Sequence, residues 1–352
     1  MTVLQLVPSL ESGGVERGTL ELANELVRRG HKSLVISGGG RMVSALTQGG
    51  SEHIRWPLGR KSPATFLFVP RLRRLIRERG VEIVHARSRM PAWIAWWAIQ
   101  GTRAHFVTTV HGLYSVNAYS AIMTRGERVI VVSETVRQYI LKNYRACDPA
   151  RIRLVFNGID PHAFPYGYRP AQFPILVPQG KRILTLPGRI TRLKGHEDFL
   201  QLLCGLPETI GLVVGGEDPR HARYARQLRR RAPPNVIFAG HRDDMRDILA
   251  GSTIVFSLSR RPESFGRTTL EALSLGVPVI GYDHGGVGEL LTKLLSEGRV
   301  PVGDLEGLSY RTRQFLAAKP FVPARHPFQL EQTLRQTLAV YEELLRVSGD
   351  RG

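Results

Sequence analysis

The chain has 352 residues, 42% of them hydrophobic, and a formal net charge of +19 at pH 7. A chain of this length exceeds the size at which a single core usually stops growing, so we expect two domains. Its two cysteines, Cys147 and Cys204, exclude a disulfide framework, and no apolar run reaches the roughly 18 residues of a membrane-spanning helix. The first residues lack the basic and long apolar regions of a signal peptide, so a cytoplasmic location is expected.

Apolar runs typical of strands alternate with helical periods in both halves. The expected strands are residues 3–7, 33–37, 83–85, 106–110 and 128–133, then 183–186, 212–214, 236–239, 254–258 and 277–281. This alternation predicts βαβ units with parallel sheets. Residues 167–180 contain three prolines and two glycines and are interpreted as a linker.

The predicted fold class is therefore α/β, with two Rossmann-like doubly wound domains over residues 1–166 and 181–327. A long helix over about residues 328–352 is expected to pack back on the first domain. In such sheets ligands bind at the carboxyl ends of the strands, so we expect the domains to face each other across a binding cleft.

Candidate residues of the first half follow its strands. Gly13 and Gly14 stand between the first strand and a strongly periodic helix. A glycine turn at a helix N-terminus lets backbone amides approach an anion, although a plain strand-to-helix turn explains the glycines too. His111 directly follows the fourth strand and is expected at the carboxyl edge of the sheet, although a lone histidine is more often a structural residue.

The second half offers two cations on a loop after its first strand. The segment PGRITRLKG places Arg189 and Lys194 between residue 186 and a helix start. This arrangement suits a diphosphate, since arginine can bond two oxygens at once. A solvated basic loop explains the charges but not their position.

The segment ESFGRTTLE contains two acids eight positions apart, Glu263 and Glu271. We expect a strand over 254–258, a loop over 260–266 and a helix over 268–275. Backbone amides at this helix start, over residues 264–268, could hold a phosphate, whereas carboxylates would repel it. Carboxylates instead accept hydrogen bonds from neighbouring hydroxyls. A ligand arranged as sugar, diphosphate and ribose has hydroxyls at both ends, so one acid would lie at each end of it. An acid near a helix N-terminus plus an ordinary helical glutamate remains the simpler interpretation of either residue alone.

Taken together, SGGVER, PGRITRLKG, NGID, PESFGRTTLEALSLGVPVIG and GGVGELL resemble family 4 of the retaining glycosyltransferases, over nearly the whole chain. The resemblance implies the two-Rossmann-domain architecture called GT-B and a nucleoside diphosphate sugar donor, for which we expect UDP as the nucleotide. It also implies transfer with retention of anomeric configuration, by a front-face route, and neither a metal nor a cofactor. The first domain is expected to take the acceptor.

The resemblance also implies roles for individual residues. Arg189 and Lys194 match residues that contact the donor diphosphate, Glu271 matches one that bonds the ribose, and Glu263 matches one that contacts the transferred sugar. His111 is expected beneath that sugar. The remaining expected donor contacts are Gly13, Gly14, Ser264, Phe265, Gly266, Arg267 and Thr268. Ser264 stands where the family usually has glycine, and Arg267 and Thr268 replace an apolar residue and a proline, so the donor sugar stays open.

The charge is concentrated in the first half, with +13 over residues 1–177 and +6 over the rest. The run FVPRLRRLIRERG predicts a basic amphipathic helix, which either lies on anionic lipid or simply presents a solvated face. With the resemblance, it suggests a glycan or lipid-linked acceptor at the inner face of the cytoplasmic membrane, as in lipopolysaccharide core or other cell-surface glycan synthesis.

Two other classes of protein stay open at this point. A nucleic-acid-binding protein would explain the charge, but no recognised reading motif is present and we expect no nucleic-acid partner. A nicotinamide-dependent oxidoreductase shares the Rossmann layout, yet the chain has no GxGxxG with an acid about 20 residues later.

Overall fold

The computed structural model describes residues 1–11 and 13–349. Its contacts divide the chain into two compact units. Unit 1 comprises Met1–Phe156 together with the C-terminal residues from Glu331, and unit 2 comprises Asn157–Leu330. The boundary expected from the sequence, at residue 166, lies inside unit 2. Residues 167–180 contain no helix or strand, and three of their side chains, Phe173, Ile175 and Val177, pack against the core of unit 2.

Unit 1 contains a seven-stranded sheet in the order β3-β2-β1-β4-β5-β6-β7, with every neighbouring pair parallel. Its strands are β1 (Thr2–Leu6), β2 (Lys32–Ser37), β3 (Glu52–Arg55), β4 (Ile83–Ala86), β5 (His105–Val110), β6 (Arg128–Val131) and β7 (Ile152–Leu154). The central strands are almost wholly buried because helices cover both faces of the sheet.

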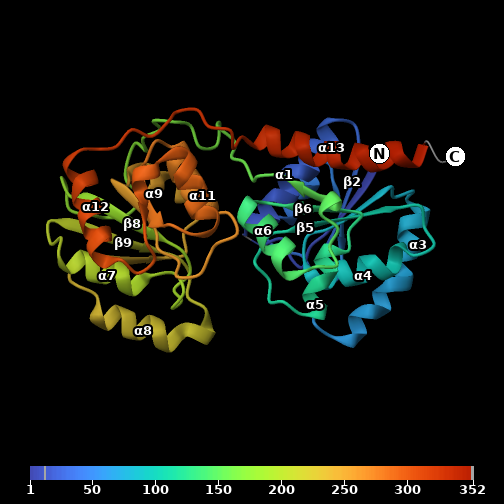
Figure 1. The fold of residues 1–352 in the computed structure, drawn as a ribbon, viewed down its shortest axis with the longest axis horizontal. Coiled ribbons are helices and arrows are strands. Elements are labelled where there is room, and N and C mark those ends of the chain that lie inside the picture. The colour runs from blue at the N-terminus through green and yellow to red at the C-terminus, as the bar shows by residue number, and fades with distance from the viewer. Residues whose placement is uncertain (12, 350–352) are drawn as a thin grey trace. The chain divides into compact units, whose positions relative to one another are not determined.

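The helices of unit 1 are α1 (Gly14–Arg28), α2 (Val43–Gln48), α3 (Phe68–Glu78), α4 (Arg89–Ile99), α5 (Ala118–Ala121), α6 (Glu134–Asn143) and α13 (Leu330–Gly349). Helices α1 and α13 share one apolar cluster with the sheet, while α3 and α4 lie side by side on the other face (Figure 1). The C-terminal helix is fixed there by Tyr341, whose hydroxyl lies 2.6 Å from Nδ1 of buried His85.

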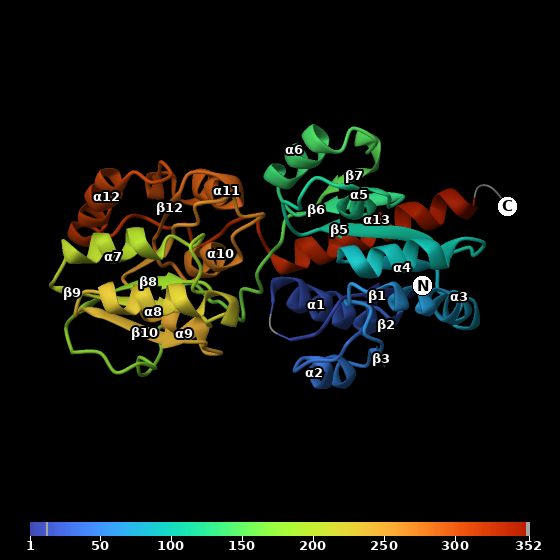
Figure 2. The same ribbon diagram turned by 90° about the horizontal axis from the view of Figure 1, so that it is seen from below.

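Unit 2 contains a six-stranded sheet in the order β10-β9-β8-β11-β12-β13, again with parallel pairs throughout. Its strands are β8 (Arg182–Pro187), β9 (Thr209–Val214), β10 (Val236–Gly240), β11 (Ile254–Ser257), β12 (Val279–Tyr282) and β13 (Arg299–Val300). Its helices are α7 (His196–Cys204), α8 (Ala222–Arg231), α9 (Met245–Gly251), α10 (Arg267–Ser274), α11 (Gly285–Leu294) and α12 (Leu305–Ala317). Helix α7 contacts α8 and α12, and α10 contacts α9 and α11, so the helices form a layer on each face (Figure 2).

The predicted fold class, two Rossmann-like doubly wound domains, is confirmed. Each expected strand overlaps an observed one, and the observed helix α10 begins one residue before the expected range. The strands that the sequence did not predict are β3, β7 and β13. All three are short strands at an edge of their sheet, so each pairs with only one neighbouring strand. Edge strands are less buried than central ones, and these arginine-containing sequences lack the continuous apolar run that marks a buried strand.

The strand order reverses once in each sheet, and this point locates the candidate site. In unit 2 the reversal lies between β8 and β11, and in unit 1 between β1 and β4. Doubly wound sheets bind ligands outside the carboxyl ends of the strands at such a reversal. The loops that follow β8 and β11 carry the cations and acids singled out in the sequence.

Candidate functional site

The loop after β8 turns sharply and lies against the end of β11. Gly188 has φ 140° and Gly195, which begins helix α7, has φ 71°, values that favour glycine. A Cβ atom on Gly195 would lie 2.1 Å from the carbonyl oxygen of Leu258. Glycine at this position therefore allows Lys194, the preceding residue, to come close to the loop after β11, while Arg189 stays exposed.

The loop after β11 is held from two sides by backbone hydrogen bonds. The amide of Arg260 donates to the carbonyl of Leu193 at 2.8 Å, and the amide of Gly286, at the start of α11, donates to the carbonyl of Glu263 at 2.8 Å. Gly266, with φ 90°, then begins helix α10. These hydrogen bonds give the loop a defined shape.

Lys194 and Glu263 meet in an ion pair. The Nζ atom of Lys194 lies 2.6 Å from Oε1 of Glu263, and the hydroxyl of Ser259 donates to the same oxygen at 2.5 Å. The two charged side chains are 33% and 25% exposed. Burial raises the pKa of Glu263, but the charge and hydrogen bond of Lys194, with the bond from Ser259, outweigh it and hold the pKa below its ordinary value. Glu263 is therefore an anion at neutral pH that can accept further hydrogen bonds.

The remaining candidates of unit 2 lie at or within α10. Glu271 is buried, and its Oε1 lies 3.5 Å from Nε of Arg267 one turn earlier. Phe265 is buried beneath the loop, whereas Ser264 and Thr268 are partly exposed. The structure thus brings Lys194 and Glu263 into contact at the strand reversal, with Glu271 and Arg267 paired on the helix that follows.

In unit 1, His111 follows β5 next to an arginine that the sequence analysis missed. The Nε atom of Arg87 donates to Nε2 of His111 at 3.4 Å, and its Nη1 donates to the Gln5 side chain and to the carbonyl of Gly18. Burial, followed by the charge of Arg87, holds the pKa of His111 well below its ordinary value, so this imidazole is neutral at pH 7. Arg87 directly follows β4, beside the reversal of that sheet, and this position is the signal that could have identified it.

Gly13 and Gly14 begin helix α1, as expected. The carboxylate of Glu16 folds back over Gly13, and a Cβ atom on Gly13 would lie 2.1 Å from Oε2 of Glu16. An acid favours this position because of the helix dipole. An external anion at this helix start would first have to displace the Glu16 side chain, a feature that the sequence analysis did not foresee.

Three further residues of unit 2 were also missed. Asp198, Arg260 and Tyr282 form a connected group, in which Arg260 and Tyr282 both contact the buried Asp198 carboxylate. No motif marks them, because acids and arginines are common near helix starts and in loops. Within the described residues, no three His, Cys, Asp or Glu side chains are grouped so as to hold a metal ion.

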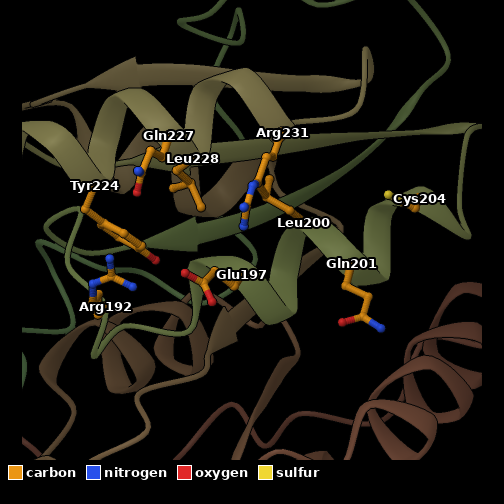
Figure 3. A pocket seen from close by; sticks show the side chains of 9 residues that line it. All are labelled: Arg192, Glu197, Leu200, Gln201, Cys204, Tyr224, Gln227, Leu228 and Arg231. Carbon is orange, nitrogen blue, oxygen red and sulfur yellow. The ribbon is translucent and has the colours of Figure 1, made fainter.

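A separate groove of about 520 Å³ lies between α7 and α8 (Figure 3). The side chains that line it are those of Arg192, Glu197, Leu200, Gln201, Cys204, Tyr224, Gln227, Leu228 and Arg231. The guanidinium of Arg192 lies over the Tyr224 ring, 4.9 Å from its centroid. None of the residues expected from the sequence lines this groove, so it is distinct from the candidate site.

Two family models match the chain. "Glycosyltransferase Family 4" matches residues 12–163 and "Glycosyl transferases group 1" matches residues 169–321, which leaves little of either unit unmatched. The chain belongs to the family 4 glycosyltransferases. It is therefore a transferase, and this membership disfavours the oxidoreductase alternative.

Curated relatives of this glycosyltransferase include N-acetyl-alpha-D-glucosaminyl L-malate synthase of Bacillus anthracis, which is 24% identical with 96% of each chain covered. Lipopolysaccharide core biosynthesis mannosyltransferase LpsB of Rhizobium meliloti is 26% identical over 55% of this chain and 61% of its own. Among solved structures, a glycosyltransferase from Rickettsia africae has a TM-score of 0.84 at 29% identity, with 98% of both chains covered. Anabaena Alr3699/HepE in complex with UDP and glucose has a TM-score of 0.78 at 16% identity, with 99% of both chains covered, and so shares the fold.

Proposed function

We propose that this glycosyltransferase transfers a hexose or N-acetylhexosamine from a nucleoside diphosphate sugar, with UDP the favoured nucleotide, to a hydroxyl of a glycan or glycolipid. The observation that carries the proposal is the contact of Lys194 with Glu263 at the carboxyl ends of β8 and β11. A cation for a phosphate and an acid for hydroxyls lie side by side where doubly wound sheets bind nucleotides. The UDP and glucose bound to Alr3699/HepE, which shares the fold, support this choice of donor class.

The residues of unit 2 have complementary roles in this proposal. Arg189 and Lys194 neutralise the diphosphate, and the amides of residues 264–268 at the start of α10 add hydrogen bonds. Glu263 accepts hydrogen bonds from the transferred sugar, and Glu271 from the ribose. As the glycosidic bond stretches, negative charge grows on the leaving phosphate, so these fixed cations and amides stabilise the transition state more than the ground state.

The residues of unit 1 have proposed roles of their own. His111 is held neutral and lies beside the Arg87 guanidinium, so it can offer a hydrogen bond to a sugar without adding charge. Displacement of the Glu16 carboxylate from its place over Gly13 would let the donor phosphates approach the amides of Gly13 and Gly14. The acceptor would also bind to this unit.

The chemistry proposed is retention by a front-face route without a metal. Glu263 is already bonded to Lys194 and Ser259, which makes it better suited to binding than to a double displacement that needs a second carboxylate. A donor phosphate oxygen would help to deprotonate the acceptor hydroxyl. Activity that persists in EDTA, together with an α-linked product from an α-linked donor, would support both points.

The acceptor is proposed to be anionic or membrane-bound, as in lipopolysaccharide core or other cell-surface glycan synthesis, with LpsB as a relative of that kind. Within this proposal, the surface that meets the membrane is the segment just before α3. The apolar residues Leu72 and Ile76 of α3 are buried, so that face is not free for lipid. Phe66 and Leu67, just before α3, are 40% and 73% exposed, and they adjoin the exposed arginines of α3. No helix among the described residues is long and apolar enough to span a bilayer.

A thermal-shift panel tests the proposed donor class. UDP-glucose, UDP-N-acetylglucosamine, GDP-mannose and ADP-glucose are compared at equal concentration, with NADH as the negative control. We expect a rise in Tm with at least one nucleotide sugar, followed by hydrolysis or transfer with that sugar. A response to NADH alone, or no response to any nucleotide sugar at millimolar concentration, would contradict the proposal.

A further inference from the structure

Asp198 is a buried carboxylate that joins three elements of unit 2. It lies in the first turn of α7 and is 2% exposed. Its oxygens accept hydrogen bonds from Nε of Arg260 at 3.1 Å, from Nη2 of Arg260, and from the hydroxyl of Tyr282 at 2.6 Å. Tyr282 is the last residue of β12 and is fully buried, whereas Arg260 lies in the loop after β11. A buried charge of this kind is costly unless it is fully paired, and here both oxygens are bonded.

The same region contains a continuous seam between the two loops that hold Lys194 and Glu263. Gly195 lies directly against Leu258, and the backbone of Arg260 bonds to Leu193 at 2.8 Å. The paired hydrogen bonds between the Asp198 carboxylate and the Arg260 guanidinium lie next to this seam. Asp198 comes three residues after Gly195, and Arg260 is the residue whose backbone bonds to Leu193. On the far side of the second loop, Nε2 of His284 lies 2.7 Å from the carbonyl oxygen of Ser259.

We propose that Asp198 is a positioning residue that fixes the loop of Glu263 relative to the loop of Lys194 by holding Arg260 and Tyr282. The hydrogen bonds of the Asp198 side chain go to Arg260 and Tyr282, so it acts through the two loops. This inference rests on the proposed function, in which Glu263 binds the sugar and Lys194 binds the diphosphate. It explains how the chain holds these two side chains at a fixed distance before a donor binds. The bidentate geometry matters here, because a planar fork fixes direction as well as distance.

The first test compares the kinetics of Asp198→Asn with those of the wild type. The substitution keeps the side-chain size but removes the charge and one acceptor for Arg260. We expect kcat to fall by about 10- to 100-fold, since small displacements of binding groups cost that much, with a smaller change in KM for the donor. Tyr282→Phe removes one of the three hydrogen bonds and should lower kcat by a few-fold. A purely structural role would lower the folded fraction and leave kcat per folded molecule unchanged.

Asp244→Asn provides the matched control. Asp244 forms a similar fork with Arg242, in the loop after the edge strand β10 of the same sheet. We expect its kcat to stay within twofold of the wild type. An equal loss of kcat in Asp244→Asn and Asp198→Asn would overturn the proposal.

The second test needs no donor, so it separates this inference from the proposed function. Hydrogen exchange is followed by mass spectrometry in peptides that cover residues 190–195 and 259–266. In Asp198→Asn we expect exchange in both peptides to be at least tenfold faster, while peptides of α9 stay unchanged. If Asp198→Asn fails to fold, Arg260→Lys, which alters the exposed partner, takes its place. Unchanged exchange in a folded variant would overturn the inference whatever the donor panel shows.

Discussion

Replacement of Glu263 by glutamine should change nucleotide binding and sugar transfer in opposite directions. This carboxylate holds Nζ of Lys194 at 2.6 Å. A donor diphosphate that uses the same ammonium group must share it with an anion. Glutamine keeps the shape of the side chain but removes the competing charge, so Glu263→Gln should bind a free nucleoside diphosphate more tightly while it transfers sugar more slowly.

The magnitude of the gain follows from the geometry. A phosphate oxygen bound to Lys194 would lie about 4–5 Å from the Glu263 carboxylate, given charge-assisted bonds of about 2.8 Å on each side of the ammonium. Coulomb repulsion at that distance is about 1–4 kcal/mol for an effective dielectric constant between about 80 and 20. Because both side chains are partly exposed, at 33% and 25%, the lower part of this range applies. We therefore expect an affinity gain of about 1–2 kcal/mol, or about five- to thirtyfold in Kd.

Isothermal titration calorimetry with UDP, or with the diphosphate that matches the best donor, measures this gain directly. Glu271→Gln is the comparison variant, because it alters the carboxylate proposed for the ribose and should weaken the same nucleotide. Transfer by Glu263→Gln should fall by at least tenfold at saturating donor, since the sugar loses a charged acceptor. Equal or weaker nucleotide binding by Glu263→Gln would refute the idea that the two anions compete for Lys194.

Further predictions concern stability, acid sensitivity and membrane binding. The pKa of Glu263 is held below its ordinary value of 4.5, so the ion pair stabilises the fold fully above that pH and its contribution is lost as the pH falls through the lowered pKa. Lys194→Met should thus cost about 1–2 kcal/mol at pH 7 and less at pH 3.5 in urea titrations, and a cost independent of pH would count against the pair. Tyr341→Phe, which leaves Nδ1 of buried His85 without the Tyr341 hydroxyl, should cost about 1–3 kcal/mol in the same assay, whereas a neutral result would show that this hydrogen bond does not hold α13. In flotation with anionic liposomes at low salt, wild-type protein should rise with the vesicles and Leu67→Glu should rise less; no flotation of the wild type would exclude the proposed membrane contact.

The fold could be predicted well from the sequence because its signals are local. Buried parallel strands are continuous apolar runs, and glycines such as Gly195 and Gly266 mark turns that need positive φ. The motif residues Lys194 and Glu263 could each be assigned to a loop for the same reason, since each follows a recognisable strand. Their direct ion pair could not be foreseen, because it depends on how Gly195 lies against Leu258.

Residues that act through tertiary contacts escaped prediction. Asp198 lies in an ordinary helical segment, and its burial depends on Tyr282, 84 positions further along the chain. Arg87 likewise gains its position from α1 and His111, far from it in sequence. Glu16 is an unremarkable helical acid in the sequence, yet its carboxylate lies over Gly13, one of the glycines that were expected to meet a phosphate. Such residues become visible only when the strand order places their elements together.

A crystal structure with a bound nucleoside diphosphate tests the proposed donor site most directly. We expect the diphosphate within about 2.7–3.1 Å of Nζ of Lys194 and of the Arg189 guanidinium, close to the start of α10, with the ribose next to Glu271. A diphosphate that is bound instead in the groove between α7 and α8, with the Lys194–Glu263 contact intact and no density beside it, would contradict the proposal.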